Sequence, residues 1–225
     1  MKKIILTLLA VYLLGLLGYW GIKLFAFSER IKEDMVREEI FFAEGEVQDG
    51  DIIFQTSKSS QSKAIQLATK SKYSHMGIIY KSEESIYVYE AIQPVKLTLL
   101  SEWINRGKNK HYVIKRLENA DEILTAGVLE NMKSYGEQFK GKNYDSYFEW
   151  SDDRIYCSEL VWKMYKESTG IAIGQLEELA DFDLSSKIIK QKMKERYGQN
   201  IPMGEKVISP AAMFNSSKLI TVIEY

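Results

Sequence analysis

Two apolar segments joined by a short polar turn constrain the fold of this chain more than any other feature of its sequence. Residues 74–80 (SHMGIIY) and 86–92 (IYVYEAI) are rich in aromatic and β-branched residues, and the polar residues 81–84 (KSEE) lie between them. This pattern predicts two antiparallel strands connected by a hairpin loop. A hairpin must bury its apolar face against other elements, so we expect an α+β fold with an antiparallel sheet and packed helices.

The remaining elements follow from hydrophobic periodicity and from start and stop signals. Further strands are expected at residues 51–54, 111–116 and 218–224. Helices are expected at residues 60–70, 101–106, 120–138, 156–168, 175–181, 184–197 and 210–214. Ser209 followed by Pro210 is a typical helix start, and Gly170 is a plausible helix stop.

Composition limits the class of protein. The chain has 225 residues and a formal net charge of −1, which gives no overall attraction to nucleic acid. Hydrophobic residues make up 45% of the chain, enough for one sizeable core. One cysteine and two histidines cannot supply a conventional structural zinc site, and we find no glycine-rich phosphate loop. We therefore expect no metal and no cofactor.

The single cysteine, Cys157, lies where a helix is expected to begin. The first turn of a helix leaves backbone N–H groups unpaired and carries partial positive charge. That setting favours the thiolate, which is the nucleophilic form of cysteine. Cys157 also lies on the apolar stripe formed by Leu160, Val161 and Met164, so a buried structural cysteine is an equally good interpretation of this helix alone.

A base for Cys157 must be sought among two histidines. His111 opens the apolar run of the strand expected at 111–116, whereas His75 lies in the hairpin. If Tyr80 pairs with Ser85, counting back along both strands puts His75 opposite Glu90. Directly opposed side chains share a face, with Cβ atoms about 5 Å apart. A carboxylate beside an imidazole fixes its tautomer and supports the imidazolium, whereas a slip of one residue would turn Glu90 away.

Each of these residues also has an ordinary structural explanation. A lone strand histidine is more often a core or surface residue, and Glu90 alone fits a solvent-facing strand. The combination favours chemistry, because a Cys–His–Glu site needs all three residues and a structural role needs none of them paired.

The order of these motifs resembles a known family. Residues 50–54 (GDIIF), 74–78 (SHMGI) and 156–160 (YCSEL) look like the YiiX-like permuted papain-type amidases, relatives of bacterial cell-wall cysteine peptidases. In the unpermuted relatives the cysteine helix comes first, whereas here the histidine precedes the cysteine. Residues 209–214 (SPAAMF) are also similar to a segment of the family. The resemblance covers roughly residues 46–225 and implies a permuted papain-like core.

The resemblance implies roles for individual residues. Cys157 would be the nucleophile, His75 the general base and then acid, and Glu90 the residue that orients His75. Tyr144 and Tyr156 would contact substrate, and Tyr144 is also a candidate oxyanion donor, although a packed loop tyrosine is an equally good interpretation of Tyr144. The backbone N–H of Cys157 is the expected first oxyanion donor, and the sequence assigns no second.

Asp51 and Glu159 are carboxylates for which we expect structural roles. The resemblance places Asp51 in a structural Gly-Asp turn and not in catalysis. Glu159 lies in the first turn of the cysteine helix, where a carboxylate is favourably placed at the positive end of the helix dipole.

The N-terminus carries a separate signal. Met1-Lys2-Lys3 precedes an uncharged apolar stretch from Ile4 to Ile22, long enough as a helix to approach the ~30 Å hydrocarbon core of a bilayer. No small-residue cleavage site follows, so residues 1–27 favour an uncleaved transmembrane anchor over a cleaved signal segment. The N-terminal lysines predict a cytoplasmic N-terminus and an extracytoplasmic domain. Residues 28–45 are expected to form a linker helix, and residues 46–225 the hydrolase domain.

These expectations define one leading function and two alternatives. The leading hypothesis is a membrane-anchored cysteine hydrolase that cleaves amide bonds in cell-wall peptides or amino-acid conjugates. The first alternative is a lipid acyltransferase or esterase, because the distantly similar lecithin–retinol acyltransferase group also combines a histidine with a later cysteine helix. The second alternative is a non-catalytic binding module. The expected partners are an amide or peptide substrate and the membrane, without nucleic acid.

Overall fold

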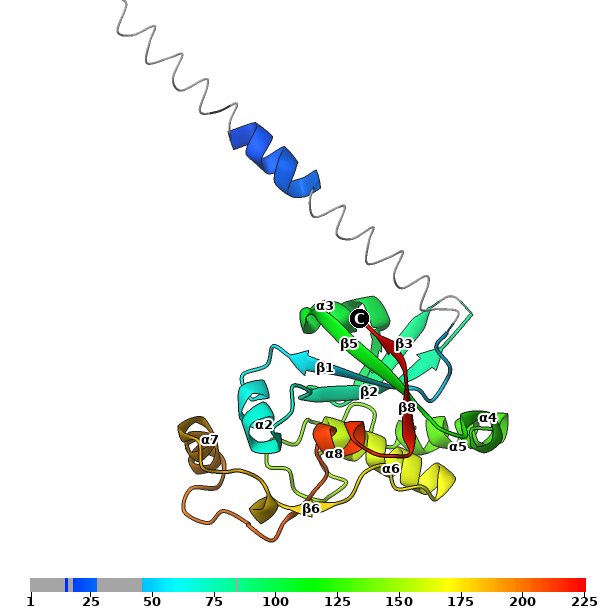
Figure 1. Cartoon of the computed structure of the whole chain (residues 1–225), viewed down its shortest axis with the longest axis vertical. Coiled ribbons are helices and arrows are strands. Elements are labelled where there is room, and N and C mark those ends of the chain that lie inside the picture. The colour runs from blue at the N-terminus through cyan, green and yellow to red at the C-terminus, as the bar shows by residue number, and fades with distance from the viewer. Residues whose placement is uncertain (1–14, 16–17, 28–45, 84) are drawn as a thin grey trace, which may run out of the picture. The chain divides into compact units, whose positions relative to one another are not determined.

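The computed structural model describes residues 15, 18–27, 46–83 and 85–225. Residues 46–225 form a compact unit around a six-stranded sheet with the order β4-β3-β2-β1-β5-β8, in which every neighbouring pair is antiparallel (Figure 1). Its strands are β1 (Ile52–Ser57), β2 (His75–Lys81), β3 (Ile86–Glu90), β4 (Lys96–Leu99), β5 (Gly107–Leu117) and β8 (Leu219–Glu224). The α+β class and the antiparallel sheet with packed helices are confirmed.

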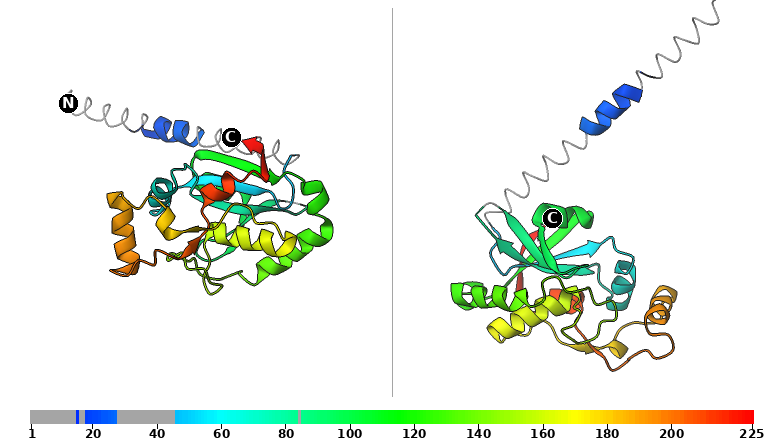
Figure 2. Two further views of the ribbon diagram at one scale, coloured as in Figure 1. Left: turned by 60° about the horizontal axis from the view of Figure 1, so that its bottom comes forward. Right: turned by 180° about the vertical axis from the view of Figure 1, so that it is seen from behind.

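Helices cover both faces of this sheet. The α-helices of the unit are α2 (Ser62–Thr69), α3 (Leu100–Arg106), α4 (Ala120–Ile123), α5 (Ala126–Glu137), α6 (Cys157–Thr169), α7 (Lys187–Tyr197) and α8 (Pro210–Phe214). Seen from the front and from behind, α3 lies on one side of the sheet, whereas α5 and α6 lie on the other (Figures 1 and 2).

The alternation of side chains along β2 divides the core into two parts. Met76 and Ile78 face α6 and pack in the same buried cluster as Leu160 and Val161. The other face, which bears Ile79, is covered by α3. Both faces of β2 are thus buried, and His75 is its first residue. His75 therefore lies at the end of the strand, between the side that packs on α6 and the side that α3 covers.

Helix α6 forms where its apolar spacing predicts it. Leu160, Val161 and Met164 are fully buried, and α6 contacts β2, β3, α5 and α8. The helix ends at Gly170, whose φ of +73° suits a residue without a Cβ. Burial of this stripe fixes the N-terminus of α6, and with it Cys157, against the end of β2.

Several expected elements differ from the structure. The helix expected at 120–138 is broken into α4 and α5, because Thr125 caps α5 by accepting a hydrogen bond from the N–H of Val128. The helix expected at 175–181 is wrong: residues 177–178 form β6, which pairs with β7 (Lys206–Val207), and a 3₁₀ turn follows at Leu179–Asp181. The sequence prediction also missed β4.

The N-terminal expectations fall mostly outside the described residues. Residues 18–27 are helical, whereas residues 1–14, 16–17 and the linker helix expected at 28–45 lie outside the described part of the chain. Among the described residues, no helix has both the length and the apolar character needed to cross a bilayer.

Candidate active site

His75 and Glu90 are in contact, although their strands pair in a different register from the predicted one. Tyr80 pairs with Tyr87 and not with Ser85, so Glu90 lies diagonally across from His75. A shift of two residues keeps both side chains on one face, and Nε2 of His75 lies 2.6 Å from Oε2 of Glu90. The predicted pairing was wrong in register, but the predicted side-chain contact is present.

Gly77 makes room for this diagonal contact. By the pairing of β2 with β3, Gly77 is the residue opposite Glu90. A Cβ at Gly77 would lie 2.4 Å from Cγ1 of Val88 and 3.3 Å from the Cβ of Glu90. The absence of a side chain at Gly77 therefore lets the Glu90 carboxylate occupy the space between the two strands.

Two residues that the sequence analysis did not single out hold the Glu90 carboxylate. Thr98 on β4 donates to Oε1 of Glu90 at 2.5 Å, and the guanidinium of Arg106, at the end of α3, donates to the same oxygen. Burial would raise the pKa of Glu90, but His75, Thr98 and Arg106 together lower it, so Glu90 is a carboxylate at neutral pH. The alternating pattern of residues 96–99 (KLTL) is the signal that could have located Thr98 on a strand.

The imidazole of His75 is buried and its pKa is raised. It stacks on Trp103 with ring centroids 5.8 Å apart. Burial would lower its pKa, but hydrogen bonds to Cys157 and Glu90 and the negative charge of those groups raise the pKa of His75 to about 9. His75 is therefore an imidazolium at neutral pH, and because Nε2 bonds Glu90, Nδ1 is the nitrogen that faces Cys157.

Cys157 is the first residue of α6 and is 2% exposed. Its backbone N–H belongs to the first turn, where helical N–H groups have no partner within the helix. The helix dipole and the His75 imidazolium both favour negative charge on its sulfur. The structure thus brings Cys157, His75 and Glu90 together in the order that a thiolate–imidazolium pair with an orienting carboxylate requires.

Tyr144 lies beside Cys157, in the loop between α5 and α6. Burial raises the pKa of Tyr144 well above its ordinary value, and the negative charge of Cys157 raises it further. Gln61 also hydrogen bonds to Tyr144, and Oε1 of Gln61 already accepts from Arg196 at 2.7 Å. The hydrogen bond from Gln61 lowers the pKa of Tyr144, which is the effect of a donor to the Tyr144 oxygen.

Tyr156 is positioned differently. Its hydroxyl accepts the N–H of Ile208 at 3.1 Å, and its ring is buried. Tyr156 lines the cavity next to Cys157. Because its hydroxyl already accepts the N–H of Ile208, we expect a contact of Tyr156 with a substrate to be made mainly by the ring.

Glu159 lies in the first turn of α6 and is fully buried. Its Oε1 forms an ion pair with Nζ of Lys163 at 2.7 Å, and its Oε2 is 3.5 Å from the N–H of Tyr156. Burial raises the pKa of Glu159 to about 8, although Lys163 and the Tyr156 N–H act to lower it. Glu159 caps the helix that carries Cys157 and is also a buried acid that can titrate near neutral pH.

Asp51 and His111 lie away from this arrangement. Asp51 is buried and forms two hydrogen bonds with Arg116, at 2.7 and 2.8 Å. His111 stacks on Tyr73, with ring centroids 6.3 Å apart. The contacts of Asp51 fit the structural role expected for it. Of the two histidines, His75 is the one that interacts with Cys157.

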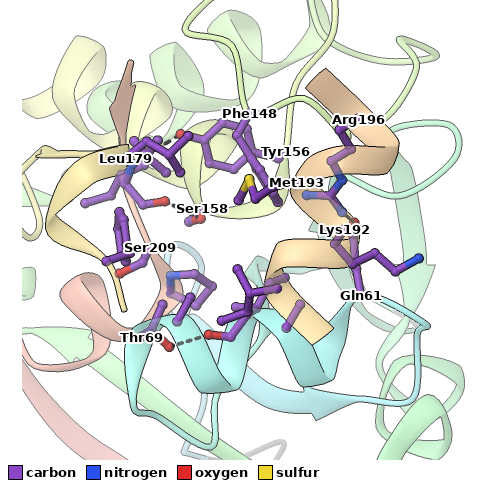
Figure 3. A pocket seen from close by; sticks show the side chains of 18 of the residues that line it. Gln61, Thr69, Phe148, Tyr156, Ser158, Leu179, Lys192, Met193, Arg196 and Ser209 are labelled. Atoms are coloured by element: carbon purple, nitrogen blue, oxygen red, sulfur yellow. Dashed lines mark hydrogen bonds between the residues drawn. The ribbon is translucent and has the colours of Figure 1, made fainter. Parts of the chain in front are cut away.

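Two cavities meet at the site. One, shown in Figure 3, has an empty volume of about 660 Å³ and is partly open to solvent. Cys157 is among the residues that line it. The other has an empty volume of about 900 Å³, also partly open, and His75 lines it. Gln61 and Tyr144 line both cavities, so the space at Cys157 and the space at His75 adjoin at these two residues.

Comparisons with known proteins identify the family of the chain. Residues 46–223 match the model of the permuted papain-like amidase enzymes of the YaeF/YiiX, C92 family. The chain is 48% identical over 175 residues to the uncharacterized protein YiiX of Escherichia coli (strain K12), covering 78% of this chain and 85% of that protein.

A solved structure is similar as well. It is described as the crystal structure of metalloprotein yiiX from Escherichia coli O157:H7 and has 47% sequence identity to this chain. The TM-score is 0.75, and the match covers 80% of this chain and 98% of the other. With its antiparallel sheet, its histidine strand before its cysteine helix and this match over most of its length, the chain belongs to the permuted papain-like amidase family of YaeF and YiiX.

Proposed function

We propose that this protein is a cysteine hydrolase that cleaves amide bonds through a thioester intermediate, with Cys157 as nucleophile, His75 as acid and base, and Glu90 as the residue that orients His75. The observation that carries the proposal is the contact chain Cys157–His75–Glu90, in which Nε2 of His75 lies 2.6 Å from Glu90 and Nδ1 is left for the thiol. Membership of a papain-like amidase family supports the same reaction class.

In the first half of the reaction, Sγ of Cys157 forms a bond to the amide carbonyl carbon and the carbonyl oxygen becomes an oxyanion. We assign the backbone N–H of Cys157 and the hydroxyl of Tyr144 as the donors that stabilise this oxyanion, because Tyr144 and Cys157 line the same cavity. The His75 imidazolium then gives its proton to the amide nitrogen. The C–N bond breaks, the amine leaves and a thioester remains on Cys157.

In the second half, water attacks the thioester carbonyl and gives a proton to Nδ1 of His75. The C–S bond breaks, a carboxylic acid is released and the thiolate–imidazolium pair is restored. Glu90 keeps the imidazole in one orientation and supports its positive charge through both halves.

No step is assigned to a metal, although the similar Escherichia coli structure is described as a metalloprotein. Within the described residues, no group of three or more His, Cys, Asp or Glu side chains is placed to hold a metal ion. The proposed mechanism therefore uses the protein's own groups alone, with Cys157, His75 and Glu90 at its centre.

Residues 1–27 are proposed to anchor the protein in the cell membrane, with the hydrolase domain outside the cytoplasm, where cell-wall peptides and amino-acid conjugates are accessible. The support is the apolar stretch after Lys2 and Lys3. Protease treatment of spheroplasts tests this: the domain should be digested from outside and the protein should fractionate with the membrane. A domain protected until lysis would contradict it, and a soluble protein lacking residues 1–27 would indicate a cleaved signal.

The reaction is tested by trapping the acyl-enzyme. The protein is mixed with a panel of peptides and N-acyl amides and quenched in acid, and its intact mass is measured. A gain equal to the acyl group, absent in Cys157→Ala and slower to form in His75→Ala, is expected. Binding of an amide with no acyl-enzyme and no released amine, unchanged in Cys157→Ala, would contradict the proposal and favour a binding module.

A further inference from the structure

Arg196 brings a positive charge from α7 to the site without an ion pair to a carboxylate of the described residues. Its guanidinium donates to Oε1 of Gln61 at 2.7 Å and lies over the ring of Phe148, 4.9 Å from the centroid. Figure 3 shows this guanidinium directed at Gln61. Lys192, one turn earlier on α7, pairs instead with Glu195 at 2.8 Å. The charge of Arg196 therefore acts on an amide and an aromatic ring.

Gln61 is held at the start of α2, next to the strand that carries His75. It is the residue before α2, and its neighbour Ser62 shares a hydrogen bond of 2.7 Å with Ser74, the residue before His75. Gln61 lines the cavity at Cys157, which lies between α2 and α7, and also the cavity at His75. Its side chain therefore links α7 to the space at both of these residues.

The amide of Gln61 has one orientation that serves both of its side-chain partners. A guanidinium has only donors, so the amide oxygen faces Arg196. The amide nitrogen, which can only donate, is then the group that makes the hydrogen bond between Gln61 and Tyr144. The hydrogen bonds thus run in one direction, from Arg196 through Gln61 to the oxygen of Tyr144.

Tyr144 lies at the end of this chain of hydrogen bonds, beside Cys157. Its N–H donates to Oε1 of Gln93 at 2.7 Å, and its backbone forms a bridge with Ile155, two residues before Cys157. Burial and the negative charge of Cys157 raise the pKa of Tyr144, whereas the positive charge of Arg196 lowers it. The charge on α7 therefore acts on the hydroxyl that is assigned to the oxyanion.

We infer that Arg196 and Gln61 are positioning residues for the oxyanion step: Gln61 holds the oxygen of Tyr144, so that the O–H points to the oxyanion, and Arg196 polarises the Gln61 amide. Tyr144 keeps its proton and donates a hydrogen bond, and the positive charge at the far end of the chain of hydrogen bonds supports the negative charge that develops. The inference rests on the proposed function and adds α7 to the elements on which the reaction depends.

The test is a double-mutant cycle on kcat, with the full-length protein and an amide on which wild type forms the acyl-enzyme. Arg196→Met keeps an unbranched apolar side chain beside Phe148 but removes the charge and the donors. It should lower kcat about tenfold with little change in KM. In the Tyr144→Phe background the same change should alter kcat less than about twofold, because the hydroxyl through which Arg196 acts is already absent.

Two further variants separate this role from a general effect of charge. Lys194→Met removes the same charge from the exposed face of α7, at a residue that lines neither cavity, and should leave kcat unchanged. Arg196→Lys should recover most of the lost kcat, because an ammonium can still donate to Oε1 of Gln61. Equal losses in Lys194→Met and Arg196→Met would overturn the inference.

Gln61→Glu tests the direction of the hydrogen bonds and needs no change at Arg196. A carboxylate of the same size still accepts from Arg196, so the variant should fold, but it cannot donate to Tyr144 and accepts the Tyr144 proton instead. We expect kcat to fall about 10²-fold, to the level of Tyr144→Phe. Gln138→Glu, exposed beyond the end of α5 and lining neither cavity, is the matched control and should be neutral. Wild-type kcat in Gln61→Glu would overturn the inference.

The outcomes separate this inference from the proposed function. If acyl-enzyme forms on Cys157 but Arg196→Met lowers kcat equally with and without the Tyr144 hydroxyl, Arg196 has only a packing role and the inference alone is overturned. If no amide gives an acyl-enzyme on Cys157, the proposed function fails and the inference fails with it.

Discussion

Nε2 of His75 lies 2.6 Å from Oε2 of Glu90, although the two residues are not opposite each other on β2 and β3. Glu90 reaches diagonally over Gly77, and its other oxygen accepts hydrogen bonds from Thr98 and Arg106. Residues of β4 and α3 thus fix the position of the Glu90 carboxylate next to the imidazole of His75. The orientation of His75 therefore depends on β4 and α3 as well as on the hairpin itself.

Glu90→Gln tests this relationship. The variant keeps the shape of the side chain but removes the charge that helps to raise the pKa of His75 to about 9. We expect the pKa of His75 to fall, so that the ring loses its proton at lower pH, and kcat to drop about 10²-fold. Titration of the ring nitrogens by NMR measures the first effect. Glu102→Gln, on the exposed face of α3, is the control, and an equal His75 pKa in all three proteins would contradict the account.

Gly77→Ala should disturb the same contact from the other strand. Its Cβ would lie 2.4 Å from Cγ1 of Val88 and 2.7 Å from the carbonyl oxygen of Tyr89, so β2 and β3 must separate. We expect a loss of about 1–3 kcal/mol of unfolding free energy, measured by urea denaturation, together with lower activity. Gly127→Ala on α5, where nothing lies within 4 Å of the new Cβ, should be neutral or slightly stabilising. Equal stability of the two variants would show that Gly77 is not needed for close packing.

Tyr144→Phe separates an oxyanion donor from a packed loop residue. If the hydroxyl of Tyr144 stabilises the developing oxyanion, its removal should lower kcat about 10²-fold with little change in KM. Tyr147→Phe alters another tyrosine of the same loop that lines neither cavity, and it should leave kcat unchanged. Similar activity of both variants would assign Tyr144 a packing role.

Glu159 predicts a specific dependence of stability on pH. Its pKa in the folded protein is about 8, above the ordinary 4.5, so the folded state holds a proton there that the unfolded chain has lost. The stability that Glu159 contributes is therefore fully present below about pH 4.5 and is lost as pH rises through 8.

Glu159→Gln removes this titration. The difference in unfolding free energy between wild type and variant should move in favour of the variant by about 1.4 kcal/mol per pH unit between pH 5 and pH 8, and then level off. Urea denaturation at several pH values measures it, and every other ionisable side chain is common to both proteins. A difference that stays constant across this range would mean that Glu159 is ionised throughout.

The sequence predicted the parts of the fold that depend on local pattern. Ser209 and Pro210 start α8 where expected, and the apolar stripe after Cys157 forms α6. Side chains alternate between the two faces along a strand. The error in the hairpin register was two residues, so it did not change the face on which His75 and Glu90 lie. His75 and Glu90 were therefore placed together for a reason that does not depend on the exact pairing.

The parts that the sequence did not predict depend on contacts between distant segments. Residues 177–178 pair with residues 206–207, and this pairing overrides the local helical pattern of 175–181. The hydrogen bonds from Thr98 and Arg106 to Glu90 join β3 to β4 and α3, and no spacing in the sequence predicts them. The cavity between α2 and α7 combines segments more than a hundred residues apart, so its apolar lining becomes visible only in the folded chain.

The most direct test of the central claim is the rate at which iodoacetamide alkylates the single thiol, measured from pH 6 to pH 9 in wild type, His75→Ala and His111→Gln. Because Cys157 is the only cysteine, the signal needs no assignment. We expect wild type and His111→Gln to react rapidly already near pH 6 to 7, and His75→Ala to react much more slowly there. If wild type reacts slowly at neutral pH and His75→Ala gives the same profile, Cys157 is not activated by His75 and the thiol-hydrolase account is wrong.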